Sequence, residues 1–187
     1  MELLLASASP RRAELLKQYG IPFTIRTVEV EELDSASDIR LLPQLNAALK
    51  ADAASEFHPG KAILAADTMI IFEDRAIGKP GSTEEAKEML RLFSGKTHEV
   101  ITGVALVCRN RQLRRIWSET SRVTFKELSA ETIDRYIREV NVLDKAGAYA
   151  IQEHSELIIE NYSGELANII GLPLKRLMNE LQQWEIS

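Results

Sequence analysis

Short apolar runs alternate with amphipathic stretches along this chain, which is the pattern of an α/β protein. Residues 3–6 and 61–66 are nearly unbroken apolar runs and predict two buried strands. We expect residues 69–72 to continue the second strand or to pair with it. Residues 73–75 (Glu-Asp-Arg) then predict a hairpin turn.

Two longer stretches, residues 97–108 and 113–125, have the β-branched and apolar content of long strands. The short polar sequence between them, residues 109–111, predicts a hairpin loop and therefore an antiparallel pair. Weaker strand patterns occur at residues 21–31, 148–151 and 156–160. The sequence thus predicts a mixed sheet, with an antiparallel hairpin at its centre and parallel crossovers outside it.

The first two helices are marked by their boundary residues. Ser9 and Pro10 begin one helix as N-cap and first helical residue, and Gly20 ends it. Pro43 is expected to begin the second helix. The predicted apolar face of this helix consists of Leu45, Ala48, Leu49 and Ala53.

Three further helices follow the same rules. Residues 83–93 form an amphipathic pattern, and Ser129 is a suitable N-cap for a helix to about residue 138. The last helix is expected after Gly171-Leu172-Pro173 and runs to about residue 184. Polar or turn-forming residues predict loops at 31–38 and 78–81.

The composition is that of an ordinary globular protein. The chain has 187 residues, 45% hydrophobic residues and a net charge of −5. This length suits a single domain, residues 1–187. An acidic chain repels phosphate polymers on average, so we expect no general binding of nucleic acid.

The cysteine content and the N-terminal sequence bear on location. One cysteine, Cys108, excludes an intramolecular disulfide, which suits a reducing compartment, and its apolar surroundings predict a core position. The apolar run at the N-terminus follows an acidic residue and precedes arginines, the reverse of a secretory signal. No stretch reaches the roughly 20 apolar residues of a membrane span. We therefore expect a cytoplasmic protein with no membrane partner.

The first candidate site is the helix start at Ser9, Arg11 and Arg12. A helix N-terminus exposes backbone N–H groups and bears a partial positive charge, to which the two arginines add. A phosphate group would fit there. A plain capped helix with two exposed arginines explains the same residues and is the more common case.

The second candidate is Asp67, which follows an apolar run where α/β proteins collect functional groups. Its carboxylate could bind a metal or take a proton from water, or it could simply cap a turn or pair with a lysine. The residues alone leave these alternatives open.

Further polar residues are weaker candidates. Lys79 lies in a stiff loop without the phosphate-binding P-loop pattern, and Lys50 lies on a helix. Glu32 belongs to an acidic segment that could hold a divalent cation or could be a solvated loop. Gln152 follows an apolar run, and its amide could read a nucleobase. The three histidines lack the spacing of a metal site.

These weak candidates occur within a series of motifs that resembles the Maf family. The first motif is Leu5-Ala-Ser-Ala-Ser-Pro-Arg-Arg12, followed by Gly20-Ile-Pro-Phe23. The others, in chain order, are Ala66-Asp-Thr68, Gly78-Lys-Pro80, Ser94-Gly95 with His98, Thr102-Gly-Val104, Asp144-Lys-Ala-Gly-Ala-Tyr-Ala-Ile-Gln152 and Gly171-Leu-Pro-Leu174. They span nearly the whole chain in the order of the family.

The resemblance implies a nucleoside triphosphate pyrophosphatase. Such an enzyme hydrolyses the anhydride between the α- and β-phosphates of a nucleoside triphosphate, with a divalent metal such as Mg²⁺ or Mn²⁺. The implied fold is an elongated mixed sheet flanked by helices, with a cleft between two lobes, similar to ITP pyrophosphatases. The resemblance also implies a homodimer.

The resemblance assigns roles to residues of this sequence. Ser9 and Arg12 would bind the phosphates, and Lys50 and Lys79 would contact the phosphates or the catalytic carboxylate. Glu32 would bind the metal or a water. Asp67 would accept a proton and share the metal.

The branch of the family is indicated by Arg11, Thr68 and Gln152, which resemble the branch that acts on dTTP, UTP and modified pyrimidine triphosphates. The chain departs from the family pattern at residues 153–155, where a glycine-containing turn is usual, and at Glu165. The implied role is the removal of unwanted nucleotides. The alternative is a nucleotide-sensing regulator of septum formation without significant turnover.

Overall fold

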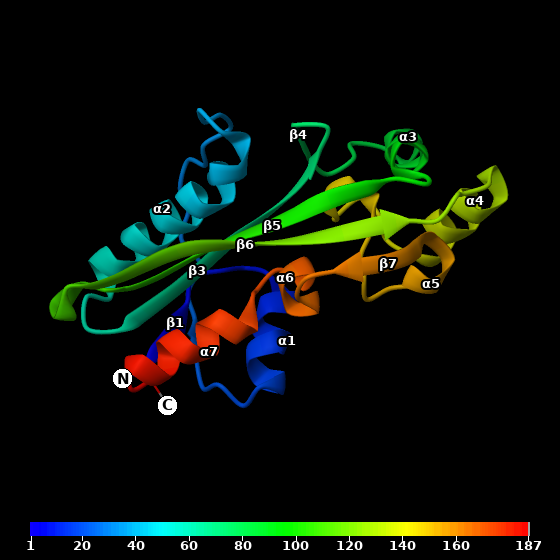
Figure 1. The fold of residues 1–187 in the computed structure, drawn as a ribbon. Coiled ribbons are helices and arrows are strands. Elements are labelled where there is room, and N and C mark those ends of the chain that lie inside the picture. The colour runs from blue at the N-terminus through cyan, green and yellow to red at the C-terminus, as the bar shows by residue number, and fades with distance from the viewer. Residues whose placement is uncertain (187) are drawn as a thin grey trace. The chain divides into compact units, whose positions relative to one another are not determined.

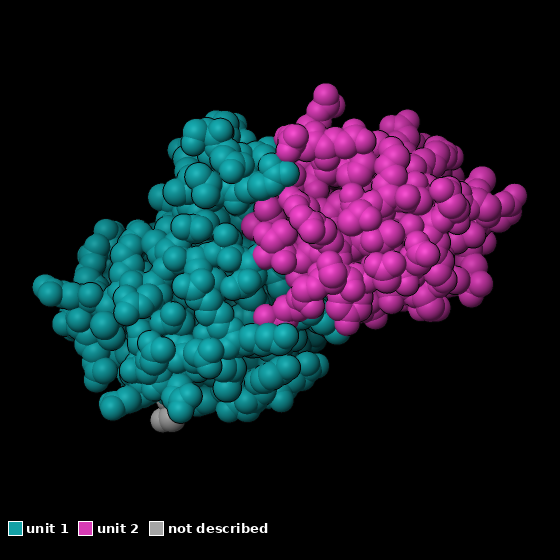
Figure 2. Space-filling model, viewed as in Figure 1, with its two compact units in different colours: residues 1–68, 102–119, 166–187 teal, residues 69–101, 120–165 magenta. Residues whose placement is uncertain are grey.

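The computed structural model of this protein describes residues 1–186, which form two compact units (Figure 2). Unit 1 consists of Met1–Thr68, Thr102–Glu119 and the described residues from Leu166 onward. Unit 2 consists of Met69–Ile101 and Thr120–Glu165.

Unit 1 contains most of the helices. Its elements are β1 (Leu3–Leu5), α1 (Pro10–Gln18), β2 (Thr24–Ile25), a 3-10 turn η1 (Ile39–Leu41), α2 (Leu42–Phe57), a second 3-10 turn η2 (Arg109–Arg111), α6 (Leu166–Ile170) and α7 (Leu174–Gln183). Three long strands each have residues in both units. These strands are β3 (Ala62–Phe72), β5 (Thr97–Cys108) and β6 (Leu113–Phe125).

Unit 2 adds shorter elements to these strands. They are β4 (Arg75–Ile77), α3 (Thr83–Phe93), α4 (Ala130–Glu139), a 3-10 turn η3 (Ala146–Ala148), α5 (Ser155–Ile158) and β7 (Ile159–Ser163). The helices α3 and α4 contact each other, and an ion pair of 2.9 Å joins Lys87 Nζ to Asp134 Oδ1.

The strands form one seven-stranded mixed sheet in the order β2-β1-β3-β5-β6-β7, with β4 paired to β3. Strand β1 is parallel to both β2 and β3, whereas the β3–β4 and β6–β7 pairs are antiparallel. The tight connection η2 makes the β5–β6 hairpin antiparallel as well. The predicted mixed α/β sheet is therefore confirmed.

The sheet of unit 1 has an apolar core on each face, because successive side chains of a strand point to opposite sides. Leu3, Leu5 and Leu64 belong to the core that α1 and α7 cover. Leu4 and Ile63 belong to the core that α2 covers. Figure 1 shows α2 on one side of these strands and α1 and α7 on the other.

The buried face of α2 differs from the prediction. Leu45 and Leu49, predicted to be apolar face residues, are 40% and 38% exposed, whereas Ala47, Ala51 and Ala54 are completely buried. Small side chains allow a helix to approach a sheet closely.

Strand β5 contributes to the same close packing. A methyl group at Gly103 would overlap the backbone of Pro43 and Gln44, at the start of α2. Of the predicted face, Ala48 is buried as expected, but the two leucines are not. The close approach to β5 favours small residues over large ones, so hydrophobicity alone misplaced Leu45 and Leu49.

Several other predictions also need correction. Of the strand predicted at residues 21–31, only β2 forms, and the chain leaves the sheet where Arg26 N donates to Leu5 O. Residues 148–151 are no strand, because Gly147 and Ala148 adopt left-handed conformations in a tight turn. Residues 156–160 are divided between α5 and β7.

The other elements agree with the sequence patterns. The bounds of α3, β5 and β6 are those predicted, and residues 69–72 continue β3. Cys108 is buried in the core of unit 1, as predicted. Among the described residues, no helix has the length and apolar character needed to cross a bilayer.

The core of unit 2 is aromatic and contains a buried histidine. His98 is 2% exposed and stacks on Phe93, with ring centroids 4.5 Å apart. Its Nε2 lies 2.7 Å from the hydroxyl of Tyr149, and Phe125 packs against both rings. Desolvation by this burial lowers the pKa of His98 to about 3.

Acid should therefore destabilise the protein through His98. An unfolded histidine titrates near 6.5, so between pH 6.5 and about 3 the unfolded chain binds a proton that the folded chain does not. The free energy of unfolding then falls as the pH falls below about 6.5. At about pH 5 the loss from this residue alone is about 2 kcal/mol, from ~1.4 kcal/mol for each pH unit.

Urea denaturation at about pH 7.5 and about pH 5 checks this expectation. His98→Gln should lose less stability on acidification than the wild type, by about 2 kcal/mol. His154→Gln, at an exposed histidine of the same unit, is the matched control. If wild type and His98→Gln lose the same stability on acidification, His98 does not take up a proton on unfolding.

Candidate functional site

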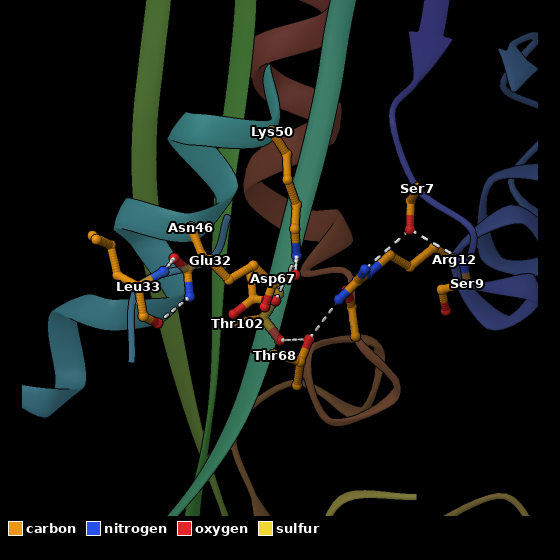
Figure 3. A network of polar contacts seen from close by, with 11 residues as sticks. Ser7, Ser9, Arg12, Glu32, Leu33, Asn46, Lys50, Asp67, Thr68 and Thr102 are labelled. Atoms are coloured by element: carbon orange, nitrogen blue, oxygen red, sulfur yellow. Dashed lines mark hydrogen bonds and ion pairs between the residues drawn. The ribbon is translucent and has the colours of Figure 1, made fainter. Parts of the chain in front are cut away.

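The centre of the site is an ammonium group between two carboxylates (Figure 3). Lys50 Nζ lies 2.7 Å from Glu32 Oε1 and 2.9 Å from Asp67 Oδ1. Lys50 projects from α2, Asp67 from β3, and Glu32 from the segment that precedes α2. The Lys50 and Asp67 side chains are 15% and 13% exposed, so solvent screens their attraction only in part.

Asp67 has one carboxylate oxygen left for other chemistry. Its Oδ1 accepts from Lys50, whereas its Oδ2 is buried and has no hydrogen-bond partner among the described residues. A buried carboxylate oxygen in this state can accept a proton from water or bind a cation. Asp67 lies within β3, not after it as predicted, because the strand continues to Phe72.

Two carboxylates near one point are a reasonable donor set for a divalent cation. No group of three or more metal-binding side chains occurs in the described part of the chain. Mg²⁺ commonly takes one or two carboxylates from the protein and further oxygens from water and substrate phosphates. Glu32 and Asp67, with the unpartnered Oδ2, fit that requirement.

A second polar centre surrounds Arg12, on the first turn of α1 (Figure 3). Its Nε donates to Gly171 O at 2.9 Å, Nη1 to Ser7 Oγ at 3.0 Å and Nη2 to Thr68 Oγ1 at 3.1 Å. A guanidinium has five N–H groups, so one remains on each terminal nitrogen for a ligand. The three internal bonds fix the plane of the guanidinium.

Charge and burial act in opposite directions on Arg12. Desolvation lowers the pKa of its guanidinium, while the negative charges of Asp67 and Glu32 raise it. An arginine stays protonated in a protein even when it is buried. The site therefore holds a fixed positive charge close to the carboxylates.

The hydroxyl groups beside Arg12 form a directed chain. Thr102 Oγ1 donates to Asn168 O at 2.9 Å and lies 2.9 Å from Thr68 Oγ1. Because a hydroxyl has a single proton, Thr102 must accept from Thr68. Thr68 therefore donates to Thr102, accepts from Arg12, and has only a lone pair to offer a ligand.

The start of α1 has the features expected of an anion site. Ser9 is the N-cap residue, but its side chain makes no capping hydrogen bond. Its backbone N donates instead to Ser7 Oγ, at 3.2 Å. The Ser9 hydroxyl is thus not used by the helix, and Arg11 follows Pro10 in the first turn.

Lys79 and Gln152, the two remaining predicted site residues, belong to unit 2. The Lys79 loop and the Gln152 loop are joined by a hydrogen bond of 2.9 Å from Gly147 N to Gly78 O. Gly147 has a positive φ of 66°, and a Cβ there would also lie close to the Ile70 side chain, so this position favours glycine. Unit 1 holds all the other predicted site residues: Ser9, Arg11, Arg12, Glu32, Lys50, Asp67 and Thr68.

The departure at residues 153–155 has a structural explanation. Lys145 is 4% exposed, and its Nζ donates to Asn141 O at 2.7 Å. The same ammonium pairs with Glu153 Oε1 at 3.2 Å and with Asp144 Oδ1 at 2.9 Å. Glu153 therefore shares a buried lysine with Asp144, and this ion pair fixes the residue that follows Gln152.

The other departure, Glu165, is held through its backbone. Its N–H donates to Ser121 Oγ, and the Ser121 hydroxyl donates to Glu165 O, each over 3.1 Å. The structure thus accounts for the backbone of this segment within unit 2.

Sequence reasoning missed three side chains that organise the site. Ser7 and Thr102 lie inside the motifs quoted above, but nothing in their spacing indicated contact with Arg12 or Thr68. Asn46 is completely buried on α2 and binds the backbone of Leu33, next to Glu32. No local pattern in the sequence marked Asn46, because its partner Leu33 lies 13 residues away.

Comparison with known proteins gives a match over nearly the whole chain. The family model described as Maf-like protein matches residues 2–184, which includes both units. A dTTP/UTP pyrophosphatase of Bacillus cereus (strain B4264) is 43% identical over 189 residues, covering 99% of this chain and 96% of that protein. The protein of the same name from Bacillus cereus (strain G9842) is 44% identical with the same coverage.

A solved structure supports the fold. A HAM1 protein from Coxiella burnetii superposes with a TM-score of 0.55 at 17% sequence identity, covering 98% of this chain and 99% of that chain. At this identity the likeness concerns the fold alone. It agrees with the predicted α/β fold class.

Thr102→Val tests the hydroxyl chain. The variant keeps the side-chain volume but removes the donor to Asn168 O and the acceptor for Thr68. Because Thr102 is completely buried, we expect a loss of about 1–3 kcal/mol in the free energy of unfolding, measured in urea. Thr102→Ser, which keeps the hydroxyl, should lose less. Equal stabilities of the two variants would contradict a stabilising role for the Thr102 hydroxyl.

Proposed function

Because the chain belongs to the Maf family, we propose that it is a nucleoside triphosphate pyrophosphatase that hydrolyses dTTP and UTP. The observation that supports this most directly is the Lys50 bridge between Glu32 and Asp67, beside the anchored guanidinium of Arg12. This arrangement combines fixed cations, which suit a polyphosphate, with a carboxylate that can act on water. Modified pyrimidine triphosphates are further proposed substrates.

Phosphate binding follows from charge. A triphosphate brings roughly four negative charges, and a unit charge pair at about 4 Å interacts by about 4 kcal/mol at an effective dielectric of about 20. Arg12 offers its two remaining N–H groups, and the α1 N-terminus offers backbone N–H groups and the Ser9 hydroxyl. We propose that Lys50 and Lys79 neutralise the remaining charge.

Asp67 is the proposed general base. Its Oδ2 accepts a proton from a water molecule that attacks the α-phosphorus in line with the leaving group. A bond forms between the water oxygen and the α-phosphorus, and the bond from the α-phosphorus to the bridging oxygen breaks. The products are the nucleoside monophosphate and pyrophosphate.

Lys50 orients the base in this mechanism. Its hydrogen bond to Asp67 Oδ1 fixes the carboxylate so that Oδ2 remains directed away from the ammonium. Catalysis then rests on positioning and electrostatic stabilisation, as in other phosphoryl transfers.

We propose that Glu32 and Asp67 hold a divalent cation, Mg²⁺ or Mn²⁺. When bound, such a cation neutralises phosphate charge and polarises the phosphoryl oxygens. The support for this assignment is the proximity of the two carboxylates, which contact the same ammonium.

The pyrimidine preference has a proposed basis in Thr68, with Arg11 and Gln152 as further contacts of the nucleotide. Because the Thr68 proton is donated to Thr102, Thr68 can only accept a hydrogen bond from a base. Uracil and thymine present an N–H donor at N3, whereas cytosine presents an acceptor there. At N3, an acceptor-only threonine therefore favours uracil and thymine over cytosine.

The remaining assignments are proposals on the same basis. We propose a cytoplasmic enzyme that removes unwanted nucleotides, without nucleic-acid or membrane partners, acting as a homodimer. A nucleotide sensor of septum formation without turnover is the alternative. A sensor has no need of a base, so the orientation of Asp67 by Lys50 favours turnover.

Asp67→Asn should separate catalysis from binding. The amide cannot act as a base, so we expect pyrophosphate release from dTTP to fall by at least about 100-fold, and up to about 10,000-fold. Binding of dTTP should change far less, because Arg12 and the α1 N-terminus are intact. Pyrophosphate release and nucleotide calorimetry measure the two effects. Release at the wild-type rate would exclude Asp67 as the base.

A panel of triphosphates tests the specificity. With added Mg²⁺ or Mn²⁺, dTTP and UTP should be hydrolysed with higher kcat/KM than CTP, ATP and GTP. Faster hydrolysis of N7-methyl-GTP would contradict the branch assignment. No pyrophosphate from any triphosphate would favour the sensor instead.

A further inference from the structure

We propose that Asn46 is a positioning residue for Glu32: its side-chain amide clamps the backbone of Leu33 and so presents the neighbouring carboxylate to the cation. This inference rests on the proposed function in one respect, the assignment of Glu32 as a cation ligand. Neither the family motifs nor the residue spacing point to Asn46.

The clamp consists of two complementary hydrogen bonds (Figure 3). Asn46 Oδ1 accepts from Leu33 N at 2.8 Å, and Asn46 Nδ2 donates to Leu33 O at 3.1 Å. The amide thus pairs with the backbone of one residue in the manner of a neighbouring strand. Asn46 is 0% exposed, so its amide oxygen and nitrogen do not exchange these hydrogen bonds for bonds to water.

The clamp acts on a segment that has no regular structure. Residues 26–36 form neither helix nor strand, so no ladder of backbone hydrogen bonds fixes the position of Glu32. Polar contacts tie this segment to α2: Leu33 binds Asn46, and Glu32 binds Lys50. Val28 packs against the α2 core further upstream.

The two contacts come from one face of α2. Asn46 and Lys50 are four residues apart, so their side chains lie one above the other on the helix. A clamp at Leu33 therefore sets Glu32 beside Lys50, and it also sets Glu32 close to Asp67, which the same lysine binds.

The ion pair by itself is a weak tether. The Glu32 side chain is 50% exposed, and solvent-exposed ion pairs contribute little to the ordering of a chain. A triphosphate or a cation would also compete for Lys50 and Glu32 respectively. The Asn46 clamp does not involve either charge, so it keeps Glu32 in place when these partners change.

Mn²⁺ binding to the whole protein tests the clamp without any turnover. Asn46→Leu has a similar volume and no hydrogen-bonding groups, and it should weaken Mn²⁺ binding about 10-fold or more, as loss of an outer partner of a metal ligand usually does. Electron paramagnetic resonance of free Mn²⁺ measures this affinity. Asn46→Ala serves as a second variant should Asn46→Leu fail to fold.

The matched control is Ser55→Ala. Ser55 is also buried on α2, and its hydroxyl donates to Asp52 O at 2.7 Å. This hydrogen bond lies near the C-terminal end of α2 and involves neither Glu32 nor Leu33. Removal of the hydroxyl costs one buried hydrogen bond and should leave Mn²⁺ affinity unchanged. A loss of affinity equal to that of Asn46→Leu would show a general effect of α2 stability and overturn the clamp.

A double variant separates positioning from a merely structural role. In a Glu32→Ala background, Asn46→Leu should cause no further loss of Mn²⁺ affinity, because the ligand that it positions is absent. The same 10-fold loss in that background would overturn the proposal. So would an Asn46→Leu protein with Mn²⁺ affinity within twofold of the wild type, or a wild type that binds no Mn²⁺.

The clamp and the proposed function can fail separately. If the wild type releases pyrophosphate but Asn46→Leu retains its Mn²⁺ affinity, the clamp is wrong and the function stands. If the wild type binds Mn²⁺ through the clamped Glu32 but hydrolyses no triphosphate, the proposed function is wrong and the clamp stands.

Discussion

The ammonium of Lys50, held between the carboxylates of Glu32 and Asp67, is the interaction on which the site depends. It joins three separate segments of the chain and holds two negative charges around one positive charge. The guanidinium of Arg12 adds a second positive charge that acts on both carboxylates. Its geometry requires α2 to lie close to the sheet, which the alanine face of α2 and Gly103 of β5 allow. The packing of small residues and the chemistry of the site are therefore parts of one arrangement.

The polar network around Arg12 likewise holds a charged group in one position. Ser7, Thr68 and Gly171 each accept one N–H of the guanidinium, and Thr102 determines which way the Thr68 hydroxyl points. Gly171 has a positive φ of 126°, a conformation that favours glycine, and its carbonyl meets Arg12 Nε. A guanidinium anchored in this way reaches a phosphate without first losing conformational freedom, which is the advantage of a preorganised site.

The sequence predicted those elements whose determinants are local. The helix α3 and the strands β5 and β6 have their caps and turn residues within a few positions of their ends. These three elements were predicted with the observed bounds. The buried face of α2 was not, because it depends on the close approach at Gly103, a residue far along the chain. The apolar character of residues 148–151 predicted a strand, but these residues form none. Ala148 has a left-handed backbone conformation, with a φ of 62°, which is incompatible with an extended strand.

The site residues were indicated mainly by the family resemblance, since spacing alone left Asp67 and Arg12 ambiguous. Thr102 and Asn46 act through partners 66 and 13 residues away, and no local pattern marks such contacts. The most direct test of the account is hydrolysis of dTTP in ¹⁸O-labelled water. Attack on the α-phosphorus by water that Asp67 activates predicts the label in dTMP and unlabelled pyrophosphate. Label in the pyrophosphate, or release of orthophosphate as the first product, would contradict it.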